Sequence, residues 1–261
     1  MKSERQRRVL EMLDAVGRVD VPELARVLAI SEITVRRDLI ELETAGYLRR
    51  VHGGAVRTVG RAFDRPYRVR EGADLGVKRA IAAAAARQVA DGDAIALDTG
   101  STVLQLVDQL SEPANLTIVT ANLRTAWAVA NSRALRRPFR LIVSGGVVRE
   151  DELSMTGYSA ITHFEQMRVD VAFLGVGGIS VSAGLTDFNL EDAELKRVLV
   201  SSSRRVIVLA DSGKIGQENF VQVAQLRAAD LLITDDGARP ADVAALRQSG
   251  LSVELVPAPR D

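Results

Sequence analysis

The chain has 261 residues, of which 47% are hydrophobic and 26% are charged, so it can form one or two globular domains with buried cores. Its 34 basic and 34 acidic residues give a formal net charge of zero. The charge is unevenly distributed: residues 1–70 contain 15 basic and 10 acidic residues, a net charge of +5, and residues 71–261 contain 19 basic and 24 acidic residues, a net charge of −5. The chain has no cysteine, which excludes disulfides, thiolate catalysis and zinc–thiolate sites.

The N-terminal stretch, residues 2–8, is charged and lacks the apolar core of a signal peptide. No later stretch approaches the roughly 18 consecutive apolar residues of a membrane helix, so we expect a cytoplasmic protein with no membrane segment. A first helix is predicted over residues 3–16, because Ser3 and Gln6 have capping-box spacing. A second short helix follows Asp20, which repeats that spacing with Glu23, and its expected apolar face is Leu24, Val27 and Leu28.

Residues 31–46 predict one amphipathic helix with a buried stripe and an open basic face, which we interpret as a DNA-recognition helix. Ser31 is placed to cap its N-terminus and Gly46 to end it in a left-handed conformation. At helical spacing, the buried stripe is Val35, Leu39 and Leu42, and the open face carries Ile33, Thr34, Arg37, Ile40 and Thr44. Two short helices joined by a tight turn are typical of a helix-turn-helix, although a generic three-helix bundle gives the same apolar stripes.

Residues 47–52 predict a strand, Gly53-Gly54 a two-residue hairpin turn, and residues 55–57 the return strand of a wing. Basic side chains on this hairpin can contact DNA phosphates, although solubility alone also explains exposed arginines. The candidate DNA-binding residues of helix and wing together are Ser31, Glu32, Ile33, Thr34, Arg36, Arg37, Arg49, Arg50, His52 and Arg57.

The spacing of ten residues in this region resembles the N-terminal signature of the DeoR family of bacterial transcriptional regulators. These residues are Arg5, Val9, Leu13, Ser31, Thr34, Val35, Arg36, Arg37, Asp38 and Leu39. The resemblance implies a winged helix-turn-helix domain over residues 1–57. We expect residues 58–77, which contain glycine, proline and arginine, to be a partly ordered linker to a larger domain over residues 78–261.

In that larger domain, helical segments alternate with short apolar runs, which predicts an α/β fold with a mainly parallel sheet covered by helices. The expected strands are residues 94–97, 116–119, 140–143, 171–174, 206–209, 231–234 and 252–256. Ligands of such sheets bind beyond the carboxyl ends of the strands, so the loops after these runs are the candidate site.

Those loops are rich in Gly, Ser and Thr, which can hold a phosphate through amides, hydroxyls and the positive end of a helix. They are residues 98–102, 120–122, 144–146, 175–178 and 211–214. For any one loop, a tight turn explains the glycines equally well. The 175–178 loop lacks the full dinucleotide-binding spacing, and the two histidines lack HExxH spacing, so we expect neither a cofactor nor a metal.

The resemblance to the DeoR family continues through this domain, including residues 98–102, 170–175, 184–186 and 211–214. The family's effector domain is related in fold to ribose-5-phosphate isomerase and binds phosphorylated sugars. The resemblance implies that residues 99–102 and Lys214 hold a phosphate and that Asn122, Glu191 and Lys196 face the sugar. A surface pair on one helix is the alternative for Glu191 and Lys196. The full candidate effector set is Asp98, Thr99, Gly100, Ser101, Thr102, Asn122, Gly145, Gly177, Glu191, Lys196 and Lys214.

We therefore expect a transcriptional regulator, a repressor of a sugar or polyol operon, that binds double-stranded operator DNA and a phosphorylated sugar or polyol. An inverted-repeat operator predicts a homodimer or higher homo-oligomer. The main alternative is a sugar-phosphate isomerase, but the loop at residues 174–178 has no carboxylate to act as a base, so we expect no enzymatic activity. A protein-binding scaffold is a third alternative, and it leaves the signature and the loops unexplained.

Overall fold

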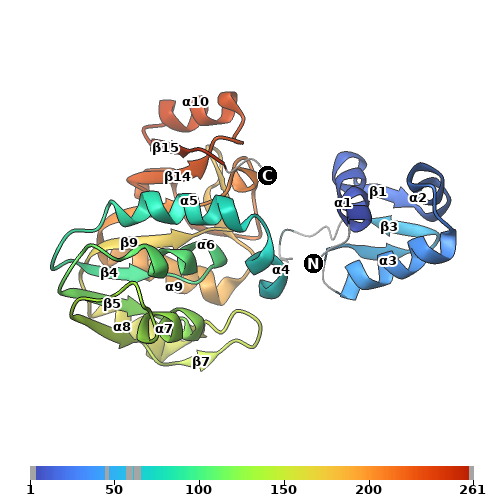
Figure 1. Ribbon diagram of the computed structural model, residues 1–261. Helices are drawn as coiled ribbons and strands as arrows, with labels where there is room; N and C mark the ends of the chain where they lie inside the picture. The colour runs from blue at the N-terminus through green and yellow to red at the C-terminus, as the bar shows by residue number, and fades with distance from the viewer. Residues whose placement is uncertain (1–3, 45–46, 57–60, 62–65, 259–261) are drawn as a thin grey trace. The chain divides into compact units, whose positions relative to one another are not determined.

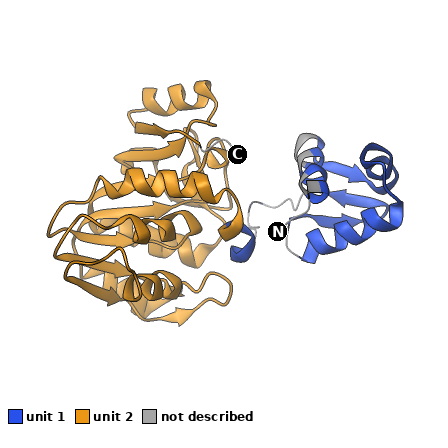
Figure 2. Ribbon diagram, viewed as in Figure 1, with its two compact units in different colours: residues 1–70 blue, residues 71–261 orange. Residues whose placement is uncertain are grey.

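The computed structural model describes residues 4–44, 47–56, 61 and 66–258. The chain divides into two compact units, Met1–Arg70 and Glu71–Asp261 (Figure 2). The division falls inside the segment expected as a linker, residues 58–77. Part of that segment is helical, because α4 spans Tyr67–Gly72 and α5 spans Leu75–Ala86.

In its described residues, the first unit combines helices with a small antiparallel sheet of strand order β1-β3-β2 (Figure 1). The helices are α1 (Glu4–Val16), α2 (Val21–Leu28) and α3 (Glu32–Thr44). The strands are β1 (Arg18–Asp20), β2 (Arg49–Val51) and β3 (Gly54–Val56). One core joins the helices through Val9, Leu13, Leu24, Val35, Leu39 and Leu42. This is the predicted winged helix-turn-helix, extended by a strand, β1, that the sequence did not indicate.

Two predictions about α2 are wrong. Asp20 occupies the N-cap position, but its side chain makes no capping hydrogen bond; instead Arg18 contacts its carboxylate at 3.3 Å. Val27 is 40% exposed, and the buried face is formed by Val21 and Leu24. The other two expected caps, Ser3 and Gly46, lie outside the described residues.

The turn of the wing is shifted by one residue from the prediction. Val51 pairs with Gly54, so the two turn residues are His52 and Gly53, and Gly53 has a φ of +78°. Gly54 belongs to β3, where a Cβ atom would lie 2.1 Å from the backbone oxygen of Val19. Glycine is therefore required at position 54 by the close approach of β1, and at position 53 by the turn.

The second unit is built on a seven-stranded sheet of order β15-β14-β12-β9-β4-β5-β6, in which every pair is parallel. All seven expected apolar runs form its strands. Their bounds are Ala94–Leu97 (β4), Leu116–Thr120 (β5), Phe139–Val143 (β6), Val169–Gly175 (β9), Ser203–Leu209 (β12), Leu231–Asp235 (β14) and Ser252–Val256 (β15). The predicted α/β class and parallel sheet are confirmed.

Helices cover both faces of this sheet (Figure 1). On one face, α5, α6 (Ser101–Leu104), the 3-10 helix η1 (Gln105–Gln109) and α7 (Leu123–Ala130) share a core with Ile95 and Leu97 of β4. On the other face, α8 (Tyr158–Glu165), α9 (Leu190–Ser201) and α10 (Pro240–Gln248) share a core with Ala96 of the same strand. Burial on both faces explains why the strands read as continuous apolar runs.

Shorter elements lie beside the main sheet. One is an antiparallel sheet of β10 (Gly178–Ser180), β11 (Gly184–Asp187) and β13 (Val221–Ala224). Another is the hairpin of β7 (Val147–Val148) and β8 (Met155–Thr156). Two further 3-10 helices are η2 (Ser212–Lys214) and η3 (Leu226–Ala228). Among the described helices, none has the length and apolar content that crossing a membrane requires.

Candidate functional site

Helix α3 has the two faces that its sequence predicts. Val35, Leu39 and Leu42 are at most 2% exposed, whereas Ile33 is 80% exposed and the side chain of Arg37 is 82% exposed. The open face is therefore exposed to solvent, as a surface that contacts a ligand must be.

Several side chains on this face are held by neighbours on the same helix. The Ser31 hydroxyl accepts the backbone N–H of Thr34 at 3.2 Å, which confirms the predicted N-cap, and its Oγ lies 2.9 Å from the Thr34 Oγ1. Arg36 pairs with Glu32 at 3.0 Å and Arg37 with Glu41 at 3.3 Å. Exposed pairs of this kind are weak, so both arginines can exchange their carboxylate for a phosphate or a base edge.

The wing carries two of its expected basic residues on β2. Arg49 is exposed, and Arg50 is connected to α3 through Glu43, which accepts its backbone N–H at 2.7 Å and lies 3.7 Å from its guanidinium. His52 is exposed in the turn, and Arg57 lies outside the described residues. The contact with Glu43 fixes the start of the wing against α3.

A partly buried ion pair that the sequence did not indicate connects α1 to α3. The Arg5 guanidinium donates to both carboxylate oxygens of Asp38, at 2.5 and 2.8 Å, and the Asp38 side chain is 3% exposed. The hydrogen bond and the charge of Asp38 raise the pKa of Arg5 above its ordinary value. Both residues belong to the signature described above, but their separation of 33 positions hides the contact.

In the second unit, the loops that follow β4, β5, β9 and β12 share one edge of the sheet, because these parallel strands are neighbours. The hydroxyl residues after β4 are largely enclosed there, with Thr99, Ser101 and Thr102 between 5% and 8% exposed. Helix α6 begins at Ser101, behind Gly100, whose φ is +149°. After four residues it continues as η1.

Asp98 and Lys196 are brought together as a buried ion pair. Lys196 Nζ donates to Asp98 Oδ2 and, at 2.9 Å, to the backbone oxygen of Gly175, and it lies 3.4 Å from Asp187 Oδ2. Burial raises the pKa of Asp98 to about 6 even though the charge of Lys196 acts in the opposite direction. Burial disfavours the charged form of Lys196, but the charges of Asp98 and Asp187 outweigh it and raise its pKa above the ordinary value.

Three other candidates do not contact that pair directly, although Asn122 Nδ2 donates to the hydroxyl of Thr99, next to Asp98, at 3.4 Å. Asn122 is 2% exposed and caps α7 by accepting the backbone N–H groups of Arg124 and Thr125. Glu191 lies 3.7 Å from Arg149, so the alternative of a Glu191–Lys196 surface pair is wrong. Gly145 has a φ of +71° and no atom within 4 Å of its Cβ position, so only its backbone is available.

Gly177 and Lys214 belong to a further group of side chains at the same edge. A Cβ atom on Gly177 would lie 2.7 Å from the Phe188 ring and 2.8 Å from Asn219 Nδ2. Lys214 Nζ lies 5.4 Å from the centre of the same ring, within the range of a cation–π contact. Asn219 Nδ2 is buried without a hydrogen-bond partner among the described residues.

Phe188 and Asn219 are the residues that sequence reasoning missed. Neither lies at the end of a main-sheet strand, where we expected the site. Both flank strands of the small sheet, β11 and β13. The sequence offered only a weak signal, the paired glycines at 177 and 178, each of which leaves room for Asn219.

Comparisons with known proteins agree along the whole chain. Residues 5–59 match the family described as "DeoR-like helix-turn-helix domain", and residues 74–236 match "DeoR C terminal sensor domain". The "HTH-type transcriptional regulator GolR" of Listeria innocua serovar 6a is 32% identical over 252 residues, which cover 97% of this chain and 98% of that protein. The "Glycerol-3-phosphate regulon repressor" of Escherichia coli K12 is 30% identical, covering 90% of this chain and 91% of the relative.

Among solved structures, the ribose 5-phosphate isomerase from Plasmodium falciparum covers 52% of this chain and 51% of its own, with 17% identity and a TM-score of 0.37. A likeness this distant carries no argument about ligand or reaction. The two family matches and the full-length relatives, together with the winged helix-turn-helix, decide the identity. The chain belongs to the DeoR family of DNA-binding transcriptional regulators.

Proposed function

We propose that this regulator represses a sugar or polyol catabolic operon and responds to a phosphorylated intermediate of that pathway. The observation that carries the proposal lies at the carboxyl edge of the main sheet. The hydroxyl residues after β4, Lys214 after β12 and the Asn219 amide, which has no hydrogen-bond partner among the described residues, are all found there. The repressor named for the glycerol-3-phosphate regulon, a relative of nearly equal length, supports the same assignment.

The phosphate end of the effector is assigned to Thr99, Ser101 and Thr102, together with Lys214. Their hydroxyls, the first amides of α6 and the ammonium group can form charge-assisted hydrogen bonds with phosphate oxygens. Strand β9 lies between β4 and β12, so the two loops are about 10 Å apart at the usual strand spacing. A small phosphorylated metabolite can bridge that distance.

The remainder of the effector is assigned to the space beside Gly177. Asn219 Nδ2, which lacks a partner among the described residues, supports a hydrogen bond to an effector oxygen. Asp98 and Lys196 would act from behind the site, since each is already engaged by the other. Their role is to hold the ends of β4 and β9 in position.

For DNA, we assign base contacts to Ile33, Thr34 and Arg37 on the open face of α3, and phosphate contacts to Arg49 and the rest of the wing. The same face carries Ser31, Glu32 and Arg36, which shape the start of the helix. Such a module reads one half-site, so the protein would act as a homo-oligomer in the bacterial cytoplasm.

An isomerase remains the second candidate, and the charges around the site disfavour it. Two carboxylates beside the 175–178 loop, Asp98 and Asp187, both face Lys196, and neither is free to abstract a proton from a sugar. The names of the relatives, which are transcriptional regulators, point the same way.

The proposal is tested with a DNA fragment selected by the full-length protein from a random pool. Operator affinity and melting temperature are measured with matched phosphorylated and free sugars and polyols, for wild type and Lys214→Ala. A phosphorylated effector at 100 times its Kd should stabilise the protein by about 2.7 kcal/mol and change operator affinity. An equal response to free and phosphorylated compounds, or an undiminished response in Lys214→Ala, would contradict the phosphate site.

A further inference from the structure

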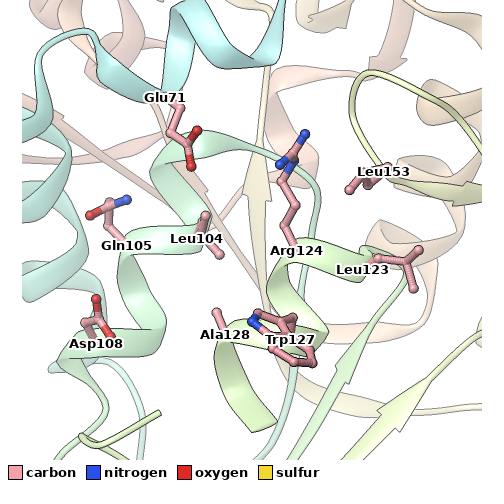
Figure 3. Close-up of a pocket in the computed structure, with 9 residues that line it drawn as sticks. All are labelled: Glu71, Leu104, Gln105, Asp108, Leu123, Arg124, Trp127, Ala128 and Leu153. Atoms are coloured by element: carbon pink, nitrogen blue, oxygen red, sulfur yellow. The ribbon is translucent and has the colours of Figure 1, made fainter. Parts of the chain in front are cut away.

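A groove of about 430 Å³ lies on the second unit, between α7 and the α6–η1 segment (Figure 3). None of its lining residues belongs to the candidate effector set, although Leu123 directly follows Asn122, the N-cap of α7. Its apolar lining consists of Leu104, Leu123, Trp127, Ala128 and Leu153.

The apolar rim of this groove is open to solvent. Trp127, the only tryptophan of the chain, is 72% exposed, and Leu123, one helical turn earlier on α7, is 39% exposed. Since side chains four residues apart on a helix are neighbours, the two form a continuous apolar ridge. Tryptophan is among the residues most enriched at the energetic centres of protein interfaces.

The apolar surface continues beyond the helix. Helix α7 packs against β6, the last strand of the sheet, and Leu141 of β6 joins the core on that side. Side chains alternate along a strand, so Phe139 and Val143 share the face of Leu141, and they are 37% and 38% exposed. Ridge, groove and strand together form an exposed apolar patch of the kind that marks an interaction site.

We propose that this patch binds a second copy of the same chain, with Trp127 of each copy inserted into the groove of the other. A two-fold axis requires one surface to complement itself, and here a ridge and a groove of matching character lie side by side on the same helix. One winged helix per chain reads one half-site, so a two-fold pair is the assembly that an inverted repeat requires.

The charges bordering the groove fit that arrangement. Glu71 and Asp108 lie along one side, and Arg124 lies along the other, on α7 (Figure 3). A two-fold axis that runs parallel to the groove places the basic side of one copy against the acidic side of the other. Charge complementarity of this kind fixes the register of an interface and excludes other partners.

The test measures the dimer dissociation constant of the full chain by sedimentation over a concentration series, with far-UV circular dichroism to verify folding. Wild type should reach twice the 28.1 kDa chain mass at micromolar concentration. Trp127→Ala should raise the Kd at least about 10-fold, as expected for a residue at the centre of an interface. Tyr158→Ala is the matched control, because Tyr158 is 84% exposed but belongs to α8 on the opposite face of the sheet, and its Kd should not change.

A second variant, Leu123→Glu, keeps the tryptophan as a reporter. In wild type, Trp127 emission should shift to the blue and become protected from acrylamide as the dimer forms, and in Leu123→Glu both changes should require at least about 10-fold more protein. A dimer whose Kd is unaffected by Trp127→Ala would overturn the proposal. So would a dimer that leaves Trp127 open to the quencher, as a groove reserved for a small molecule would do, or a wild type that stays monomeric with operator DNA.

Discussion

Lys196 and Asp98 form an ion pair that is buried on both sides, with side chains 4% and 1% exposed. The pair connects α9 to the end of β4, and the bond from Lys196 to the Gly175 backbone oxygen attaches the end of β9 to the same point. The Gly175 N–H in turn donates to Asp98 at 3.0 Å, so one cluster fixes the two loops that border the proposed effector site.

Replacing Lys196 with Met should destabilise the second unit by about 3–5 kcal/mol, because it leaves the Asp98 carboxylate buried and without its cation. Urea unfolding followed by circular dichroism measures this loss. The double variant Lys196→Met with Asp98→Asn should lose less than the sum of the single variants. Additive losses would mean that the two side chains do not act as a pair.

The pKa of Asp98 predicts a specific pH dependence. Because it is raised to about 6 in the folded protein, the contribution of this group to stability is present below about pH 4 and is lost as the pH rises through 6. The unfolding free energy of wild type minus that of Asp98→Asn should therefore fall by up to about 3 kcal/mol between pH 4 and 7. A difference that is constant over this range would contradict the assignment. Lys196, whose pKa is also raised, contributes stability that is lost only in alkali, above its unfolded value.

Gly54→Ala should unfold much of the first unit, with a loss of more than about 3 kcal/mol, because its Cβ would meet the Val19 backbone oxygen at 2.1 Å. Gly53→Ala is the matched control, since its Cβ position is open and only the left-handed φ of +78° is unfavourable, at about 1–2 kcal/mol. Thermal unfolding of both variants measures the difference. Equal losses would mean that β1 does not approach the wing as described.

Arg37→Ala should lower operator affinity by about 1–3 kcal/mol, and the loss should depend on the base pair at one position. Arg49→Ala should weaken all sequences alike and reduce the salt dependence of binding by about one ion, as a phosphate contact does. Titration of operator variants at several salt concentrations separates the two. Arg204, an exposed arginine of the second unit, provides a control that should change neither quantity. Wild-type affinity in Arg37→Ala would exclude the proposed orientation of α3.

Gly177→Ala should abolish the response to the effector while DNA binding persists, because the added Cβ would lie 2.7 Å from the Phe188 ring and 2.8 Å from Asn219 Nδ2 and would displace both side chains. Gly72→Ala, at the end of α4, serves as the control, since no atom lies within 4 Å of its Cβ position. Melting temperature and operator affinity, each with and without effector, give the result. A full response to the effector in Gly177→Ala would mean that the effector does not bind beside Gly177.

The sequence alone determined the elements whose signal is local. Seven apolar runs indicated the seven strands because both faces of the sheet are buried, and the spacing of Val35, Leu39 and Leu42 identified the buried face of α3 because the helix repeats every 3.6 residues. Ser31 could be recognised as a cap because its bond to Thr34 spans three residues. Strand β1 has three residues, too few for a periodic signal, and was missed.

Contacts between distant parts of the chain were decided only by the tertiary structure. Asp98 and Lys196 are 98 positions apart and meet because the strand order sets β4 beside β9, beneath α9. Arg5 and Asp38, and Gly177 and Asn219, meet for the same kind of reason. The register of the wing turn was also decided by the tertiary structure. The adjacent glycines at 53 and 54 permit a turn at either position, and the pairing of β1 with Gly54 places the turn at His52 and Gly53. Local periodicity carries no information on strand order or register, and these are what bring charged and polar side chains together.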